Sequence, residues 1–220
     1  MSKAATPEKT AVKIPSGTAT INGDLAIPRE AKGIVVFAHG SGSSRFSPRN
    51  MRVAREINEA GMATLLIDLL TSEEEEVDVR TGQFRFDIDL LSQRLIHATR
   101  WLKDNASTKN LAIGYFGPST GAAAALIAAA DLPKDVKAVV SRGGRPDLAG
   151  ESLAKVKAPT LLIVGGDDLA VLDLNREALK SIAAEKKLEI VPGATHLFEE
   201  SGKLEVVARL AISWFSKFLL

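Results

Sequence analysis

The sequence predicts an α/β domain, a mostly parallel twisted sheet of about eight strands with helices on both faces. From Gly33 onward, short apolar runs alternate with longer segments of helical period, as a parallel sheet requires. The runs are continuous, like GIVVFA at 33–38, which is typical of strands buried on both faces. The stretch NLAIGYFGPSTGAAAALIAAA at 110–130 is the clearest unit, because a strand passes through a sharp turn directly into a helix.

Composition favours one domain and excludes several classes of protein. The 220 residues are 45% hydrophobic and 25% charged, which fits a single globular domain with a large core. Basic residues number 28 and acidic residues 27, so no global charge favours nucleic acid or a membrane surface. The absence of cysteine excludes disulfides, thiolate metal sites and a cysteine nucleophile. The sequence contains no signal-peptide core and no apolar run of membrane-spanning length, so we expect a cytoplasmic protein.

The N-terminal part is expected to form a tail and a hairpin. Residues 1–9 are small, polar and interrupted by Pro7, which predicts a flexible tail before a single domain at 10–220. Two strand-like pieces, AVKI and TATINGDLAI, are separated by Pro15-Ser16-Gly17 and predict an antiparallel hairpin at a sheet edge.

The middle of the chain alternates between strands and helices. The strand at 33–38 runs into the loop HGSGSS, and a helix follows at 48–60 with Ser47 as its N-cap and Gly61 as its stop. A second strand spans 63–69. The segment 71–83 lacks an apolar period and predicts a surface loop, whose acidic run Glu73 to Glu76 is typical of a solvated loop. An amphipathic helix is expected at 87–103.

The remainder repeats the pattern to the C-terminus. Strands are expected at 111–116, 136–140, 160–164 and 188–191, and helices at 122–130, 171–184 and 204–219. The alanine-rich helix at 122–130 is too short to cross a membrane and is expected to be buried. Between the strands ending at Val140 and starting at Thr160, fewer than twenty residues remain, so we expect a short helix and no large cap domain.

Three residues with complementary chemistry follow predicted strands. Ser119 lies in the turn Gly117-Pro118-Ser119-Thr120-Gly121, Asp168 follows the strand at 160–164, and His196 follows the strand at 188–191. The carboxyl ends of parallel strands share one edge of a sheet, where ligands bind. A serine hydroxyl needs a base to become a nucleophile, and a carboxylate fixes the tautomer of that base. The chain order serine, acid, histidine is that of α/β hydrolases.

From Gly33 to the C-terminal helix, the chain resembles the α/β-hydrolase superfamily and is most similar to its compact dienelactone hydrolase-like branch. The resemblance is carried by HGSG at 39–42, GPSTG at 117–121, GGDD at 165–168 and GATH at 193–196. It implies that Ser119 is the nucleophile, His196 the base and Asp168 the acid. It also implies an oxyanion hole formed by the backbone amides of Ser41 and Thr120.

Some assignments stay open at this point. Asp167 competes with Asp168 for the role of acid, and Asp147 is an outside candidate. His39 is expected to hold its loop through hydrogen bonds, and His97 to pack or face solvent. Dienelactone hydrolases that give the branch its name use cysteine, so their substrate is not implied here.

Pro118 is the one feature of the turn that departs from the family pattern. It fixes its own φ, removes a donor and pushes Gly117 toward extended geometry. The alternative that it favours is a non-catalytic protein that binds a ligand or a partner through the same fold.

The sequence predicts the reaction class better than the substrate. We expect a serine hydrolase that cleaves a small ester, lactone or thioester, with acyl transfer as an alternative because the acyl-enzyme step is shared. Arg45, Arg142 and Arg145, with Arg49, come from loops on the same edge and are expected to hold an acidic group of the substrate unless Glu73 to Glu76 neutralise them. We expect no cofactor, no metal, no nucleic acid or membrane partner, and a monomer or homodimer.

Overall fold

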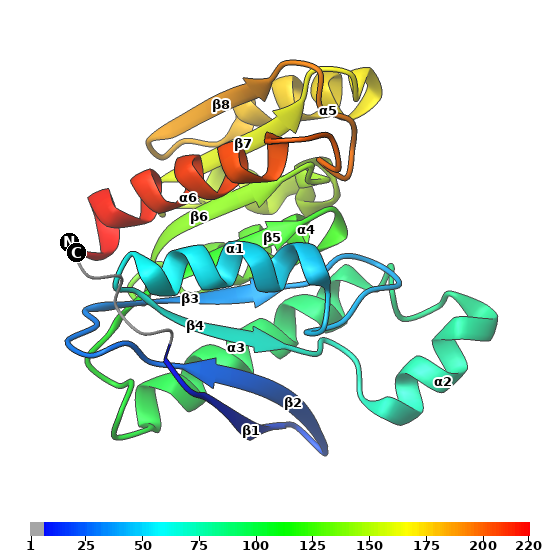
Figure 1. Ribbon diagram of the computed structural model, residues 1–220. Coiled ribbons are helices and arrows are strands. Elements are labelled where there is room, and N and C mark those ends of the chain that lie inside the picture. The colour runs from blue at the N-terminus through cyan, green and yellow to red at the C-terminus, as the bar shows by residue number, and fades with distance from the viewer. Residues whose placement is uncertain (1–6) are drawn as a thin grey trace.

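Eight strands of residues 7–220, the part of the chain that the computed structural model describes, pair into one sheet (Figure 1). Their order is β1-β2-β4-β3-β5-β6-β7-β8. The pairs β1–β2 and β2–β4 are antiparallel and all the others are parallel, which confirms the predicted sheet and its N-terminal hairpin. The strands span Lys9–Ser16 (β1), Ala19–Ala26 (β2), Gly33–Ala38 (β3), Ala63–Ile67 (β4), Ala112–Pro118 (β5), Val136–Arg142 (β6), Thr160–Gly165 (β7) and Lys186–Val191 (β8).

The helices connect these strands and cover both faces of the sheet. They span Pro48–Glu59 (α1), Ser72–Thr81 (α2), Ile88–Asp104 (α3), Thr120–Asp131 (α4), Leu169–Ser181 (α5) and Lys203–Leu219 (α6), with a short 3₁₀ segment at Pro146–Lys155 (η1). Figure 1 shows α1 and α6 together on the face of the sheet toward the viewer.

The core consists of two layers, one on each face of the sheet. Along β3, Val35 and Phe37 pack with residues of α1 and α6, whereas Ile34 and Val36 pack with residues of α3 and α4. A strand alternates its side chains between faces, so a strand with helices on both sides must be apolar at every position. This explains why the strands at the centre of the sheet appear in the sequence as unbroken apolar runs.

The strand ends of the second half of the sheet lie level with one another. Pro118 at the end of β5 pairs with Arg142 at the end of β6, and Arg142 pairs with Ile163 in β7. Gly165 then pairs with Val191 at the end of β8. The segments that follow these strands therefore start from one edge, which we call the carboxyl edge.

The N-terminal hairpin differs in detail from the prediction. Residues 1–6 of the expected tail lie outside the described residues. Lys9, which was assigned to the tail, belongs to β1 and pairs with Ala26 of β2. Pro15 and Ser16 belong to β1 rather than to the turn, which is formed by Gly17 and Thr18. Pro15 is tolerated because β1 is the edge strand of the sheet, where a missing N–H breaks no ladder.

The prediction of a surface loop at 71–83 was wrong, because Ser72–Thr81 forms helix α2. Thr71 and Glu74 form a reciprocal capping box at its start, and Gly82 ends it in the left-handed conformation. The helix shows no apolar period because it projects from the carboxyl edge (Figure 1) and buries only Asp78. A helix that packs no apolar stripe against the core cannot be found from periodicity, although the T-x-x-E signature marks its beginning.

The other predicted helices are confirmed with small shifts of their ends. Ser47 caps α1 by accepting a hydrogen bond from the Asn50 amide, as expected. Helix α5 begins at Leu169, two residues earlier than predicted, and ends at Ser181. Between β6 and β7 the chain forms only η1, so residues 7–220 contain no large cap. Within the same residues, none of the helices has the length and apolar character to cross a lipid bilayer.

Candidate active site

Ser119 lies between β5 and α4 in a strained backbone conformation. Its φ is 50° and its ψ is −125°, a region that residues other than glycine rarely occupy. The conformation is held from both sides, because the Ser119 amide donates to Arg142 O at 3.3 Å and the Ser119 carbonyl accepts from the Arg145 amide at 3.0 Å. Ser119 makes no side-chain cap to α4, so its hydroxyl is not used by the helix.

Two glycines let the turn approach its neighbours. A Cβ on Gly121 would lie 2.0 Å from the carbonyl oxygen of Ala38 in β3. A Cβ on Gly117 would lie 2.6 Å from the Ala122 Cα in α4. Both contacts are with backbone atoms that cannot move aside, so only glycine fits at these two positions.

Pro118 does not prevent this conformation. It is the last residue of β5 and remains in register with Arg142. The following residue, Ser119, adopts the strained geometry even though Pro118 offers no N–H. Pro118 is therefore compatible with the strained geometry of Ser119.

His196 and Asp168 form a hydrogen-bonded pair. His196 Nδ1 lies 2.7 Å from Asp168 Oδ2, and the Asp168 side chain is only 15% exposed. An ionised carboxylate can only accept, so the proton of this contact lies on Nδ1; in the neutral imidazole, Nε2 then carries a free lone pair. Asp168 stands at the start of α5 without capping it. Its carboxylate is thus available to orient the imidazole.

The other candidate acids do not contact His196. Asp167 is exposed, and its amide donates to Ala194 O at 3.0 Å. The Asp147 carboxylate accepts two hydrogen bonds from Arg145, at 2.9 and 2.7 Å. Among the three carboxylates considered from the sequence, Asp168 is the one whose geometry can orient the imidazole.

The histidine loop and the serine turn meet at the end of β6. A Cβ on Gly143, the residue that follows β6, would lie 3.0 Å from His196 O and 3.6 Å from His196 Nδ1. The preceding residue, Arg142, bonds to the Ser119 amide. Among the hydrogen bonds within residues 7–220, none joins Ser119 Oγ to His196 Nε2. Links of this kind are often long without substrate and shorten when it binds.

The two amides expected to form an oxyanion hole differ in their surroundings. Thr120 is the first residue of α4, where backbone N–H groups have no partner within the helix. The Ser41 amide instead donates to the Thr120 hydroxyl at 2.9 Å. The Thr120 side chain is therefore a neighbour of the site that the sequence did not reveal, because the two residues are 79 positions apart.

His39 holds the loop that follows β3, as predicted. Its Nδ1 lies 2.9 Å from Gly40 O, and its Nε2 accepts from the Leu69 amide at 2.9 Å. These bonds require the neutral imidazole, and burial lowers the pKa of His39. His97 lies elsewhere, in α3, with its Nδ1 2.7 Å from Ser16 Oγ.

The arginines expected to bind an acidic substrate have partners within the protein. Arg45 pairs with Asp68 and, at 3.5 Å, with Asp24. Arg145 is held by both oxygens of Asp147. Arg49 pairs with Glu199 at 2.8 Å. The acids Glu73 to Glu76, the alternative left open from the sequence, are not the partners of these arginines among the described residues; α2 instead holds Glu74 against Arg94 at 2.5 Å.

Arg142 is the exception, because it is buried and has no carboxylate partner within residues 7–220. Its exposed fraction is 6%, its Nη1 donates to Leu197 O at 3.4 Å, and its guanidinium stands 5.8 Å from the centre of the Phe198 ring. Burial, followed by the charge of Arg49, lowers the pKa of Arg142 to about 10. Arg142 therefore contacts the segment next to His196 from inside the protein.

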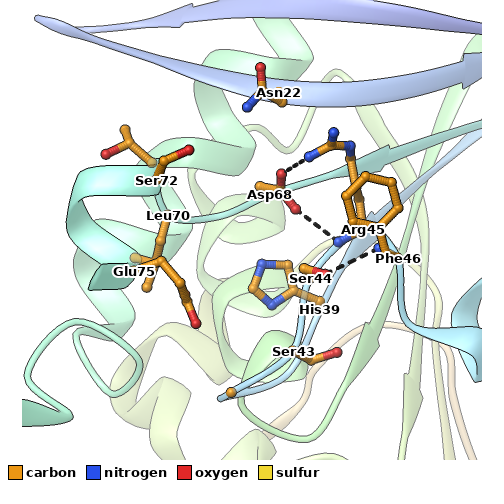
Figure 2. Close-up of a pocket in the computed structure, with 12 residues that line it drawn as sticks. Asn22, His39, Ser43, Ser44, Arg45, Phe46, Asp68, Leu70, Ser72 and Glu75 are labelled. Atoms are coloured by element: carbon orange, nitrogen blue, oxygen red, sulfur yellow. Dashed lines mark hydrogen bonds and ion pairs between the residues drawn. The ribbon is translucent and has the colours of Figure 1, made fainter. Parts of the chain in front are cut away.

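A polar cavity of about 490 Å³ lies beside this site, between the loop after β3 and the start of α2. Figure 2 shows Arg45 bonded to Asp68 on one side of it, His39 below, and Glu75 of α2 opposite. Ser119 does not line it. Within residues 7–220, no group of three His, Asp or Glu side chains is placed as metal ligands would be.

Comparisons with known proteins agree with this fold. The sequence model of the Dienelactone hydrolase family matches residues 21–217. A crystal structure of a dienelactone hydrolase from Anabaena variabilis superposes with a TM-score of 0.96 at 58% identity, covering 98% of this chain and all of that one. An α/β serine hydrolase without a lid from Xanthomonas campestris has a TM-score of 0.75 at 18% identity, covering 96% of this chain and 95% of its own, and shares the fold.

Curated relatives from two strains of Mycobacterium tuberculosis carry a different, provisional name, phosphoribosyl transferase. They are 58% identical over 204 residues, which is 93% of this chain but 45% of theirs. The chain thus spans about half the length of the curated relatives that it matches.

Proposed function

This chain belongs to the dienelactone hydrolase family, and from that premise we propose that it is a serine hydrolase that cleaves an ester, lactone or thioester through an acyl-enzyme at Ser119. The observation that carries the proposal is that a strained Ser119 and a hydrogen-bonded His196–Asp168 pair both follow strands that end at the same edge of the sheet. Strain of this kind persists only where the surrounding structure enforces it, and it clusters at functional sites.

In the first step, His196 Nε2 accepts the proton of Ser119 Oγ while that oxygen attacks the carbonyl carbon of the substrate. A new C–O bond forms, and the carbonyl oxygen becomes an oxyanion. Asp168 stabilises the imidazolium through the 2.7 Å contact with Nδ1. When the tetrahedral intermediate collapses, the bond to the leaving alcohol, thiol or ring oxygen breaks, and His196 returns the proton to that atom.

In the second step, water takes the place of the leaving group. His196 removes a proton from the water as it attacks the acyl carbon, and the bond to Ser119 Oγ breaks with return of the proton to serine. Products are a carboxylic acid and the free enzyme.

The oxyanion would be met by the amides of Thr120 and Ser41. Each such donor is worth roughly 3 kcal/mol of transition-state stabilisation. Because the Ser41 amide already donates to the Thr120 hydroxyl, the oxyanion must share or replace that acceptor.

The name of the mycobacterial relatives is not carried over to this chain. It describes proteins of which this chain matches 45%, and phosphoribosyl transfer can reside in the portion that it does not match.

Labelling with a fluorophosphonate tests the proposal, because the reagent reacts only with an activated serine. We expect one label per chain in the wild type and none in Ser119→Ala. Ser107→Ala, a change at an exposed serine in the turn before β5, is the matched control and should label fully. Absence of labelling in the wild type would contradict the hydrolase mechanism and favour a binding protein.

A further inference from the structure

The carboxyl edge offers little positive charge to a substrate. Arg45, Arg49 and Arg145 each pair with a carboxylate of the protein. Arg142 is only 6% exposed, donates to Leu197 O and has its guanidinium 5.8 Å from the centre of the Phe198 ring. An anionic substrate would have to break one of these pairs or reach an interior guanidinium, and either change costs free energy.

The same edge exposes apolar side chains next to the proposed catalytic residues. Leu169 directly follows Asp168 and is 68% exposed, and Leu197 directly follows His196 and is 38% exposed. Leu148, also 38% exposed, lies in η1, and its amide bonds to the carbonyl of Arg145, the residue that binds the Ser119 carbonyl. We call Leu148, Leu169 and Leu197 the leucine rim.

Most of the exposed large hydrophobic side chains belong to segments that follow carboxyl ends of strands. Within residues 7–220, eight large hydrophobic side chains are exposed, and six of them follow carboxyl ends of strands. Three form the leucine rim, and the others come from the loop after β3, from α2 and from the turn after it, namely Phe46, Val79 and Phe86. Single exposed hydrophobics are ordinary, but several on segments that leave the edge where Ser119 lies make that edge a candidate binding surface.

We propose that the substrate is an uncharged ester or thioester with a large apolar acyl group that packs on the leucine rim. This inference rests on the proposed hydrolase function and narrows it, because it replaces the acidic group expected from the arginines with a neutral apolar one. The occupant is the acyl group, because the acyl carbon is bonded to Ser119 Oγ in the proposed intermediate, and Leu148 is linked to the Ser119 carbonyl through Arg145.

The effect on rate follows from the burial of methylene groups. A methylene fully removed from water is worth about fourfold in affinity, and on an open rim we expect about twofold for each. Four added methylenes, from an acetyl to a hexanoyl group, therefore give roughly tenfold to twentyfold in kcat/KM.

The test compares three p-nitrophenyl esters: acetate, hexanoate and the monoester of adipic acid, which has the same chain length as hexanoate but ends in a carboxylate. In the wild type, we expect kcat/KM for hexanoate to exceed that for acetate by about tenfold and that for the adipate monoester by at least as much. Leu169→Ser/Leu197→Ser should reduce the ratio of hexanoate to acetate at least threefold. Leu220→Ser, a change at an exposed leucine that follows α6, is the control and should leave both rates unchanged.

Two results would overturn the inference. The first is a kcat/KM for the adipate monoester at or above that for hexanoate. The second is a ratio of hexanoate to acetate kcat/KM that stays unchanged both in Leu169→Ser/Leu197→Ser and in Leu148→Ser/Leu169→Ser/Leu197→Ser. Calorimetric binding of the same esters to Ser119→Ala separates this failure from failure of the hydrolase mechanism. If the wild type hydrolyses none of them but Ser119→Ala binds hexanoate at least fivefold more tightly than the adipate monoester, the mechanism fails and the apolar preference stands. Equal binding of both esters refutes the preference as well.

Discussion

The two halves of the carboxyl edge are held in place by different interactions. Around β5 to β8, the turn at Ser119 is fixed by close backbone contacts, such as those that exclude a side chain at Gly121. Around β3, β4 and α2, the chain is fixed by polar side chains, such as the fully buried Asp78, which accepts from Arg85 Nε at 2.6 Å and from two amides. The first half holds the proposed catalytic residues on a backbone with little conformational freedom. The second half lines the neighbouring cavity and is held together by ion pairs.

The two types of interaction differ in how far they can be recognised from the sequence. Backbone contacts need small residues at fixed short spacing, so they can be recognised in a motif. Charge pairs connect residues through side chains of many lengths, so partners can stand anywhere in the chain. Variants in each half should therefore fail in different ways.

The largest effect is expected in the catalytic pair. Asp168→Asn should reduce kcat for a p-nitrophenyl ester by about 10⁴-fold, because an amide favours the wrong tautomer of His196. Asp167→Asn, at the exposed neighbouring acid, should retain most of the activity. Equal losses in both variants would refute the assignment of Asp168, and steady-state kinetics measures this directly.

The next effect concerns the backbone contacts of the serine turn. Gly121→Ala should lower the free energy of unfolding by at least about 4 kcal/mol, because its Cβ would overlap the Ala38 carbonyl at 2.0 Å. Gly17→Ala is the matched control, since a Cβ there meets nothing within 4 Å and only its positive φ is unfavourable. For this control, we expect urea denaturation to show a loss of about 1 kcal/mol in the free energy of unfolding. Similar losses would show that close packing does not hold the turn.

In the charge-paired half, Arg85→Ala should destabilise the protein by about 3 kcal/mol, because it leaves the buried Asp78 carboxylate with amide partners alone. The control is Arg176→Ala, which breaks an exposed pair with Asp173 and should change the free energy of unfolding by less than about 0.5 kcal/mol. Chemical denaturation of the two variants measures the contrast. A loss in Arg85→Ala no larger than in the control would refute the anchoring role of Asp78.

The smallest effect is a dependence of stability on pH. The folded-state pKa of His39 is lowered by burial, so the unfolded chain takes up a proton more readily than the folded one. The stabilisation is complete above the unfolded pKa of about 6.5 and is lost as the pH falls from there toward the folded-state pKa, by at most about 1.4 kcal/mol per pH unit.

His39→Gln should therefore flatten the plot of unfolding free energy against pH below about 6.5. The side-chain amide introduced in this variant can still accept a hydrogen bond from Leu69 N and donate one to Gly40 O. His97→Gln should have a smaller effect, because His97 is only partly buried. Urea denaturation at several pH values measures this dependence. If the slope of unfolding free energy against pH in His39→Gln equals that of the wild type, the role of a buried neutral imidazole is contradicted.

Much of the fold and of the candidate site could be predicted from the sequence because both depend on short-range patterns. Apolar runs of strand length and helices with an apolar face gave the order of elements from Gly33 onward. Helix α2 was missed because its only buried residue is charged. Periodicity detects helices that pack apolar stripes, and α2 packs none.

The sequence by itself determined the strand–turn–helix around Ser119, since two glycines and an alanine-rich helix within a dozen residues allow few other structures. It also determined that Asp168 and His196 follow strands of the same sheet. Only the tertiary structure decided that Asp168 rather than Asp167 contacts His196, that the Ser41 amide donates to Thr120, and that three of the four candidate arginines already pair with carboxylates of the protein. These outcomes depend on side-chain contacts between residues far apart in the chain, which no local pattern encodes.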